Sequence, residues 1–252
     1  TYEAKELGLS RVKYEKYPYD LSLVVTANEI VDYFRVLLKT MEFLYPDFAA
    51  KTTHVAHGVL RLPEGKMSSR TGRVISFKDL LGEVRERILR KMGEAERKSE
   101  IAEQVSVGAL KYSMLKQAIG KDVIFDFNTS LSFEGDSGPY LQYTYARCRS
   151  VLRKAEEKGL APSAEQVPQN TEEAERMLLW FPEAVERAAR VGEPHHIAVY
   201  LGKLAKAFNN FYAREKIIDS EEAAYRLALT EAVSITLKNG LWLLGIAAPP
   251  KM

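Results

Sequence analysis

The sequence predicts an α/β region followed by an all-α region, and two observations carry this prediction. In residues 1–63, two apolar runs of strand character flank a helix of apolar periodicity. From residue 131 onward, apolar residues recur only at helical spacings. We therefore expect three segments: an α/β part over residues 1–73, a connector over residues 74–130, and a helical bundle over residues 131–252.

The composition is that of a globular protein. Apolar residues make up 46% and charged residues 28%, and no apolar run approaches the roughly 18 residues that span a membrane. The single cysteine, Cys148, excludes an internal disulfide and suits a reducing compartment, so we expect a cytoplasmic protein. Four histidines with one cysteine offer no spaced metal cluster, and the neighbours His195 and His196 are interpreted as surface residues. The 36 cations and 34 acids exclude a broad basic field, so any RNA must be bound by individually placed residues.

The first segment has the pattern of a strand–helix–strand crossover. Residues 2–8 favour a helix that ends at Gly8, a glycine of C-cap type. Leu21–Val25 is a buried-strand run, a periodic helix follows through Leu44, and a second strand covers about residues 54–62. In such a parallel crossover, ligands bind at the ends of the strands.

A short polar loop, Gly65–Arg73, follows the second strand. Its glycines allow close backbone approach, its serines donate hydrogen bonds, and Lys66, Arg70 and Arg73 carry positive charge. Such a loop suits a polyanion, above all a triphosphate that develops charge in a transition state. An exposed basic turn is the alternative interpretation of the same residues.

Helices dominate the remainder of the chain. We expect helices over residues 77–92 and 101–117, followed by a short strand over residues 122–127. Pro139 suits the first turn of a long helix that continues to about residue 158. The helices that follow are expected over about residues 171–190, 194–214 and, up to a stop at Gly245, 220–244.

Two strings resemble a known family. Residues 66–72, Lys-Met-Ser-Ser-Arg-Thr-Gly, resemble the second nucleotide-binding motif of class I aminoacyl-tRNA synthetases, usually written K-M-S-K-S, and the Ser-Ser-Arg form is similar to arginyl-tRNA synthetases in particular. Residues 138–147, Gly-Pro-Tyr-Leu-Gln-Tyr-Thr-Tyr-Ala-Arg, are the second match. The resemblance covers the whole chain. It implies the rear half of a class I Rossmann-type catalytic domain, a stem-contact connector, and a helical-bundle anticodon-binding domain of the type named for an Asp-Ala-Leu-Arg (DALR) string.

The resemblance also implies site residues. For catalysis these are Lys66, Ser68, Ser69 and Arg70, and for ATP binding they are His57, Gly58, Lys66 and Met67. For arginine they are Tyr2 and Glu6, which are four apart and share a helix face, and for tRNA they are Tyr140, Gln142, Tyr143, Arg147, Tyr212 and Met252. Two positions depart from the family pattern. Ser69 stands where the motif has its second lysine, and Glu6 stands where aspartate is more familiar.

As a whole, such an enzyme activates arginine with ATP and Mg²⁺ and esterifies it to its tRNA, with no metal site of its own. The H-I-G-H-type motif of the first half of the fold is absent from this sequence, which begins at Thr1. We therefore expect an archaeal-like fragment that is inactive without the N-terminal half of the enzyme. Two alternatives remain open: a fragment of another class I synthetase of cysteinyl type, and a non-catalytic tRNA-binding module.

Overall fold

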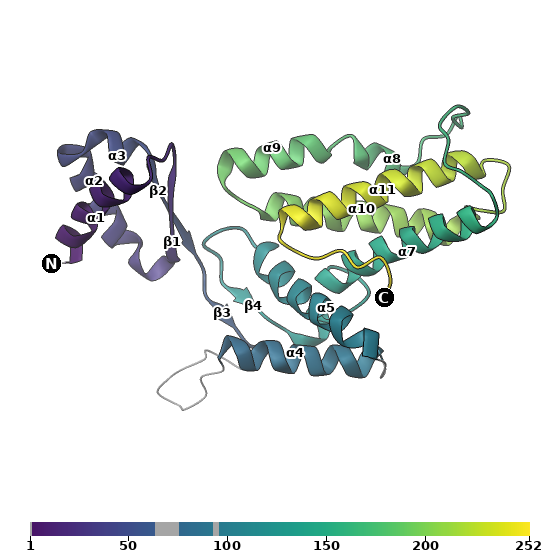
Figure 1. Cartoon of the computed structure of the whole chain (residues 1–252), viewed down its shortest axis with the longest axis horizontal. Helices are drawn as coiled ribbons and strands as arrows, with labels where there is room; N and C mark the ends of the chain where they lie inside the picture. Colours follow the sequence, from purple (N-terminus) through teal and green to yellow (C-terminus); the bar gives the residue numbers. More distant parts are fainter. Residues whose placement is uncertain (1, 64–75, 93–95) are drawn as a thin grey trace. The chain divides into compact units, whose positions relative to one another are not determined.

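The computed structural model describes residues 2–63, 76–92 and 96–252 (Figure 1). The chain forms two compact units. The first unit is Thr1–Leu60 with Ile119–Val123, and the second unit is Arg61–Ala118 with Ile124–Met252. None of the described helices is both long and apolar enough to cross a membrane.

The first unit contains the expected crossover. Strands β1 (Ser22–Ala27) and β2 (Thr52–His57) pair in parallel, with Ser22 opposite Thr52 and Ala27 opposite His57. The connection between them consists of the 3₁₀ turn η1 (Asn28–Ile30) and the helices α2 (Val31–Leu44) and α3 (Pro46–Ala50). The predicted strand–helix–strand order is therefore confirmed.

Helix α1 (Tyr2–Lys16) precedes the crossover and is longer than expected. The prediction that it ends at Gly8 is wrong, because Gly8 lacks the positive φ of a C-cap glycine and the helix continues through it. A Cβ at Gly8 would meet nothing within 4 Å, so no packing requirement explains this glycine.

The two faces of strand β1 differ in burial. The buried residues of α2 are Phe34, Leu37 and Met41, and His54 of β2 stacks on the ring of Phe34 with centroids 4.0 Å apart. On the outward face of β1, Leu23 and Val25 are 56% and 62% exposed. An apolar strand face left in water is unusual in a complete domain.

The strand expected over residues 54–62 is interrupted. It forms β2, ending at His57, and the two-residue strand β3 (Leu60–Arg61), with Gly58 between them. Gly58 lies against the backbone of the first unit's second stretch, where a Cβ would come within 2.2 Å of the Lys121 carbonyl oxygen. This close approach explains both the break and the glycine.

The second unit begins with two packed helices. Helix α4 (Phe77–Met92) matches its prediction, and its start is fixed by Ser76 and Asp79, whose side chains each bond the other residue's backbone N–H. Helix α5 (Glu96–Leu115) starts earlier than expected and contacts α4. The strand expected over residues 122–127 shrinks to β4 (Val123–Ile124), which pairs with β3, because Asp126 caps the short helix α6 (Phe127–Ser130).

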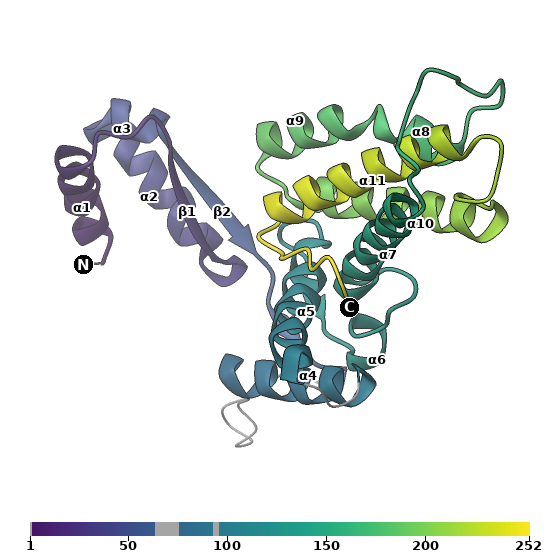
Figure 2. The ribbon, with the colours of Figure 1, turned by 45° about the vertical axis from the view of Figure 1, so that its right-hand side comes forward.

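The remaining helices form one apolar core. They are α7 (Gly138–Glu157), α8 (Glu173–Leu178), α9 (Phe181–Val191), α10 (His195–Arg214) and α11 (Ala223–Leu243). Helix α7 packs against α11 and α5, and α8 and α9 pack against α10 (Figures 1 and 2). The fully buried side chains include Leu141, Leu201, Leu204, Phe208, Leu227, Leu237 and Leu241.

Three details of this bundle test the sequence prediction. Pro139 lies in the first turn of α7 behind the N-cap Ser137, and Gly245 follows α11 with φ +65°, both as expected. The single helix expected over residues 171–190 is instead two, α8 and α9. Pro182 has no N–H to donate to the carbonyl of the preceding turn, so the helix restarts there.

Candidate functional site

A cavity of about 650 Å³ opens on the second unit. Three segments line it: one side of α7, the stretch from the end of α10 through Asp219, and the C-terminal residues 250–252. The predicted tRNA-binding residues Tyr143, Arg147, Tyr212 and Met252 all belong to its lining. The tertiary fold thus gathers residues that are up to 109 positions apart, from Tyr143 to Met252.

Arg147 occupies the centre of this group. Its guanidinium carbon lies 4.8 Å from the ring centroid of Tyr143 and 4.8 Å from that of Tyr212. Tyr143 precedes Arg147 by one turn on α7, whereas Tyr212 comes from α10. Both rings remain partly exposed, Tyr143 at 38% and Tyr212 at 40%, so each keeps surface for a flat ligand.

A hydrogen-bond chain holds Arg147 in this position. Its guanidinium donates to the side-chain oxygen of Asn209, and the Asn209 amide donates to the Tyr140 hydroxyl and the Thr144 hydroxyl, each at 2.9 Å. Asn209 therefore connects α10 with two turns of α7 and holds the guanidinium close to both tyrosine rings. Tyr140, predicted to bind tRNA directly, lies one step further back in this chain.

Asn209 was not among the predicted site residues. It precedes Tyr212 by three positions, so the two share one face of α10. That spacing was the available signal, but the partner across the interface, 62 residues earlier in the chain, is set only by the packing of α7 on α10.

The electrostatics of the cavity favour an anion. Five cations line it: Arg147, Arg153, Lys154, Lys216 and Lys251. The two acids of the lining are matched by other cations. Glu215 pairs with Arg214 at 2.8 Å and Asp219 with Lys158 at 2.8 Å, and these bonds lower the pKa of both carboxyl groups. Of the cations, Arg153 lies 4.0 Å from Glu157. With both acids of the lining matched by partners, the lining keeps an excess of positive charge for an incoming polyanion.

Gln142, also predicted to bind tRNA, does not belong to the lining of this cavity. Its side chain is completely buried. The amide nitrogen donates to the carbonyl of Gln104 in α5 at 3.1 Å and to that of Ala247 at 2.8 Å. Gln142 thus anchors the C-terminal segment, residues 245–252, and through it places Met252 at the cavity.

The absence of a side chain at Gly108 makes room for Gln142. A Cβ there would lie 2.7 Å from the Gln142 amide oxygen. Lys111, one turn further along α5, donates to the Gly245 carbonyl. Helix α5 therefore holds the C-terminal segment at two points, although it contributes nothing to the lining of the cavity itself.

In the first unit the predicted residues lie on two elements. Tyr2, 80% exposed, and the half-buried Glu6 share a face of α1, as expected. His57 ends β2, and its Nδ1 lies 2.7 Å from the carbonyl oxygen of Gly58. The predicted loop residues Lys66, Met67, Ser68, Ser69 and Arg70 lie outside the residues that the structure describes.

Two family profiles match the chain. The profile described as "tRNA synthetases class I (R), catalytic domain" matches residues 1–127, and the profile described as "DALR anticodon binding domain" matches residues 141–252. The second profile covers four residues that line the cavity, Tyr143, Arg147, Tyr212 and Met252, and also Asn209, which bonds Arg147.

Curated relatives agree with the profiles. The chain is 38% identical to the arginine–tRNA ligase of Clostridium acetobutylicum, covering 100% of this chain and 46% of the relative. It is 36% identical to that of Treponema denticola, covering 95% of this chain and 44% of the relative. The chain thus spans slightly less than half the length of these relatives.

The fold is also similar to solved structures. Arginyl-tRNA synthetase of Thermus thermophilus superposes with a TM-score of 0.78 at 31% identity, covering 92% of this chain and 41% of that one. The Plasmodium falciparum enzyme gives a TM-score of 0.72 at 24% identity. These matches decide against the cysteinyl-type alternative. The chain belongs to the arginyl-tRNA synthetase family of class I, and it carries part of the family's catalytic domain followed by its DALR anticodon-binding domain.

Proposed function

We propose that this chain is part of an arginine–tRNA ligase in which the cavity of the second unit receives the anticodon of arginine tRNA. The observation that carries the proposal is the Arg147 guanidinium, which lies 4.8 Å from the ring centroids of both Tyr143 and Tyr212 in a cation-lined cavity. The whole enzyme, working in the cytoplasm, would activate arginine with ATP and Mg²⁺ and transfer it to the tRNA.

The cavity suits one or two unstacked bases. Single-stranded bases are recognised by stacking on aromatic rings or on an arginine plane, a contact worth about 1–3 kcal/mol per base. The exposed parts of Tyr143 and Tyr212 offer such surfaces, and Met252 supplies an apolar edge. Lys216 and Lys154 stand in the lining where the flanking phosphates would pass. We assign the middle base of the anticodon to this cavity.

The first unit would take part in amino-acid activation. Lys66, Ser68, Ser69 and Arg70 are proposed to close over the triphosphate, with His57, Gly58 and Met67 beside the nucleotide. Tyr2 and Glu6 would cradle the guanidinium of arginine, since a carboxylate takes bidentate bonds from it. In this proposal residues 1–73 are catalytic, residues 74–130 contact the tRNA stem and residues 131–252 read the anticodon.

The activity requires a partner to the first unit. The outward face of β1, with Leu23 and Val25 exposed, is suited to be covered by the remaining part of the catalytic domain. These 252 residues contain no H-I-G-H-type motif, so the chain by itself should not form arginyl adenylate. ATP–pyrophosphate exchange by this chain alone would contradict that statement.

Anticodon reading is tested by equilibrium binding. The chain is titrated with arginine tRNA and with a copy whose middle anticodon base is changed, over a series of salt concentrations. We expect tighter binding of the native anticodon that persists at moderate salt, whereas contact with phosphates alone would be equal for both RNAs and vanish with salt.

Matched variants test whether the cavity is the site that recognises the anticodon. Arg147→Gln should abolish the preference for the native anticodon, and Arg190→Gln on α9 should keep it, because Arg190 carries the same charge but lies outside the cavity lining. If both variants weaken the two RNAs alike, the cavity is not the reader and the proposal fails.

A further inference from the structure

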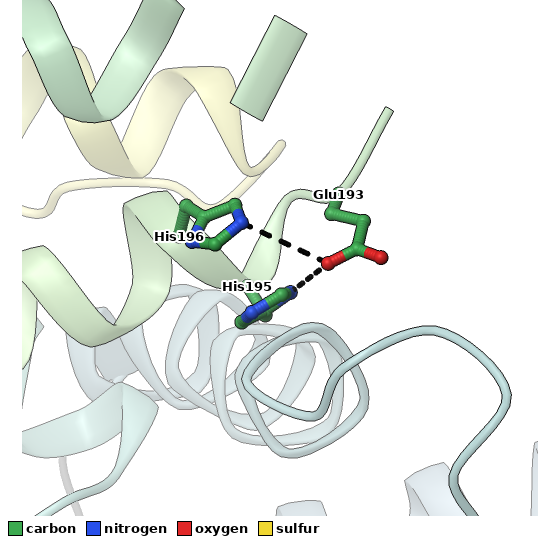
Figure 3. A group of neighbouring side chains, drawn as sticks. All are labelled: Glu193, His195 and His196. Atoms are coloured by element: carbon green, nitrogen blue, oxygen red, sulfur yellow. Dashed lines mark ion pairs between the residues drawn. The ribbon is translucent and has the colours of Figure 1, made fainter. Parts of the chain in front are cut away.

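The turn between α9 and α10 brings a carboxylate and two imidazoles to one point (Figure 3). The same oxygen of Glu193, Oε2, lies 3.1 Å from Nδ1 of His195 and 3.7 Å from Nε2 of His196. Figure 3 shows both rings directing these nitrogens toward that carboxylate. The three donor atoms all lie within 4.8 Å of one another.

Local backbone geometry produces this convergence. Gly192 adopts φ +70° after α9 and reverses the chain, and Pro194 starts α10, so His195 and His196 fall in its first turn. Their rings lie side by side with centroids 4.1 Å apart. The side chains of Glu193, His195 and His196 are 33%, 18% and 20% exposed, which leaves them partly enclosed but open to solvent on one side.

The distances between donors fit a metal ion. Zn²⁺ binds histidine nitrogen and carboxylate oxygen at about 2.0–2.2 Å, so two ligands of a tetrahedral ion are roughly 3.4 Å apart. The two distances from the Glu193 oxygen, 3.1 and 3.7 Å, lie on either side of that value, and the two nitrogens lie within 4.8 Å of each other. We propose that Glu193, His195 and His196 form a binding site for one divalent transition-metal ion of the Zn²⁺ class. A water molecule would complete its coordination.

One of the donor nitrogens lacks an aligned hydrogen bond. His195 Nδ1 is buried and makes no aligned hydrogen bond, although the Glu193 carboxylate lies beside it. A buried polar atom without a hydrogen bond calls for an explanation, and a bound ion between the two groups would supply one.

Two features oppose the ion, and both are small. The N-terminus of α10 carries a partial positive charge, and Arg187 lies nearby. A helix terminus changes the affinity of an adjacent charge by only a few-fold at an exposed site, and the full negative charge of Glu193 has the opposite sign. The set of two histidines and one carboxylate is the one that open zinc sites use. Once bound, the ion would link α9 to α10 across their turn.

Metal binding by the whole chain tests the proposal, without reference to aminoacylation. The untagged chain is stripped with a chelator and equilibrated with Zn²⁺, and then with Co²⁺ as a coloured substitute. We expect one ion per chain and a Co²⁺ absorption spectrum of the tetrahedral type. Loss of even an outer-shell contact typically costs about 10–100-fold in metal affinity, so Glu193→Gln, His195→Gln and His196→Gln should each cost at least about tenfold.

The control variant is His57→Gln, which removes an exposed histidine of the first unit and should leave the affinity unchanged. Circular dichroism checks that each variant is folded as the parent chain is. The proposal is overturned if less than one ion binds per chain, if the three ligand variants bind as well as the parent, or if His57→Gln lowers the affinity as much as they do.

Discussion

Replacement of Gln142 by alanine tests the claim that this buried amide anchors the C-terminal segment. The substitution removes two hydrogen bonds, to the carbonyls of Gln104 and Ala247, each worth about 1 kcal/mol. The Gln104 carbonyl lies inside helix α5, where the helix supplies a donor, and the exposed Ala247 carbonyl can bond water. Neither carbonyl is therefore left without a partner. The substitution also removes the Gln142 amide oxygen, which is buried without a hydrogen bond, and the free energy gained in this way offsets the cost of the small cavity that forms. We expect a loss of about 2 kcal/mol of unfolding free energy.

Urea unfolding followed by circular dichroism measures this loss. With a slope of about 1–3 kcal/mol per molar urea, the midpoint should fall by roughly 1 M. Gln104→Ala is the matched control: it removes the same kind of side chain from the neighbouring helix but leaves the carbonyl that Gln142 uses, so its effect should stay within about 0.5 kcal/mol. A Gln142→Ala protein as stable as the parent, or a Gln104→Ala protein equally destabilised, would refute the anchoring role.

The same variant links stability to RNA recognition. Because the Ala247 contact positions the residues up to Met252, its loss should free one edge of the cavity. We expect Gln142→Ala to reduce the preference for the native anticodon while binding at low salt, which rests on the cations of the lining, is kept. An unchanged preference would show that the C-terminal segment does not shape the reader.

Three further predictions follow from individual contacts. Gly108→Ala should destabilise the second unit in urea although alanine favours helices, because the new Cβ would press on the Gln142 amide. Cys148 is fully buried, and burial raises the pKa of its thiol. A thiol reagent should therefore label it only at the rate of unfolding. Rapid labelling of the native chain would contradict this packing. Hydrogen bonds from Thr129 lower the pKa of Asp126, so the stability that Asp126 gives over Asp126→Ala should be complete above about pH 5 and be lost as the pH falls through that lowered pKa. Equal stability of the two proteins at pH 7 would show that this cap is not used.

Local sequence determined the elements and the family. Helices α4, α7 and α10 were predicted almost to the residue, because apolar periodicity and Pro139 act within a few positions of the chain. The predicted bounds of helices and strands were wrong where a residue had a different structural role from the one that its local pattern indicated. Gly8 continues a helix, Pro182 restarts one, and Asp126 caps a helix at a point where alternation predicted a strand.

Only the tertiary structure decided what the neighbours Gln142 and Tyr143 do. Both residues belong to the family motif at the start of α7. Because a helix turns about 100° per residue, Gln142 faces α5 and Tyr143 faces the solvent. Which face is covered depends on the helix that packs against it, from a distant part of the chain.

The same holds for the contacts that build the cavity. Asn209 reaches Arg147 across 62 residues, and no local pattern specifies that pair. Even the adjacent His195 and His196, interpreted from sequence as surface, converge on Glu193 only through the reversal at Gly192. Side-chain spacing along the chain fixes periodicity, whereas side-chain direction in space is fixed by the packing of whole helices, and the site depends on direction.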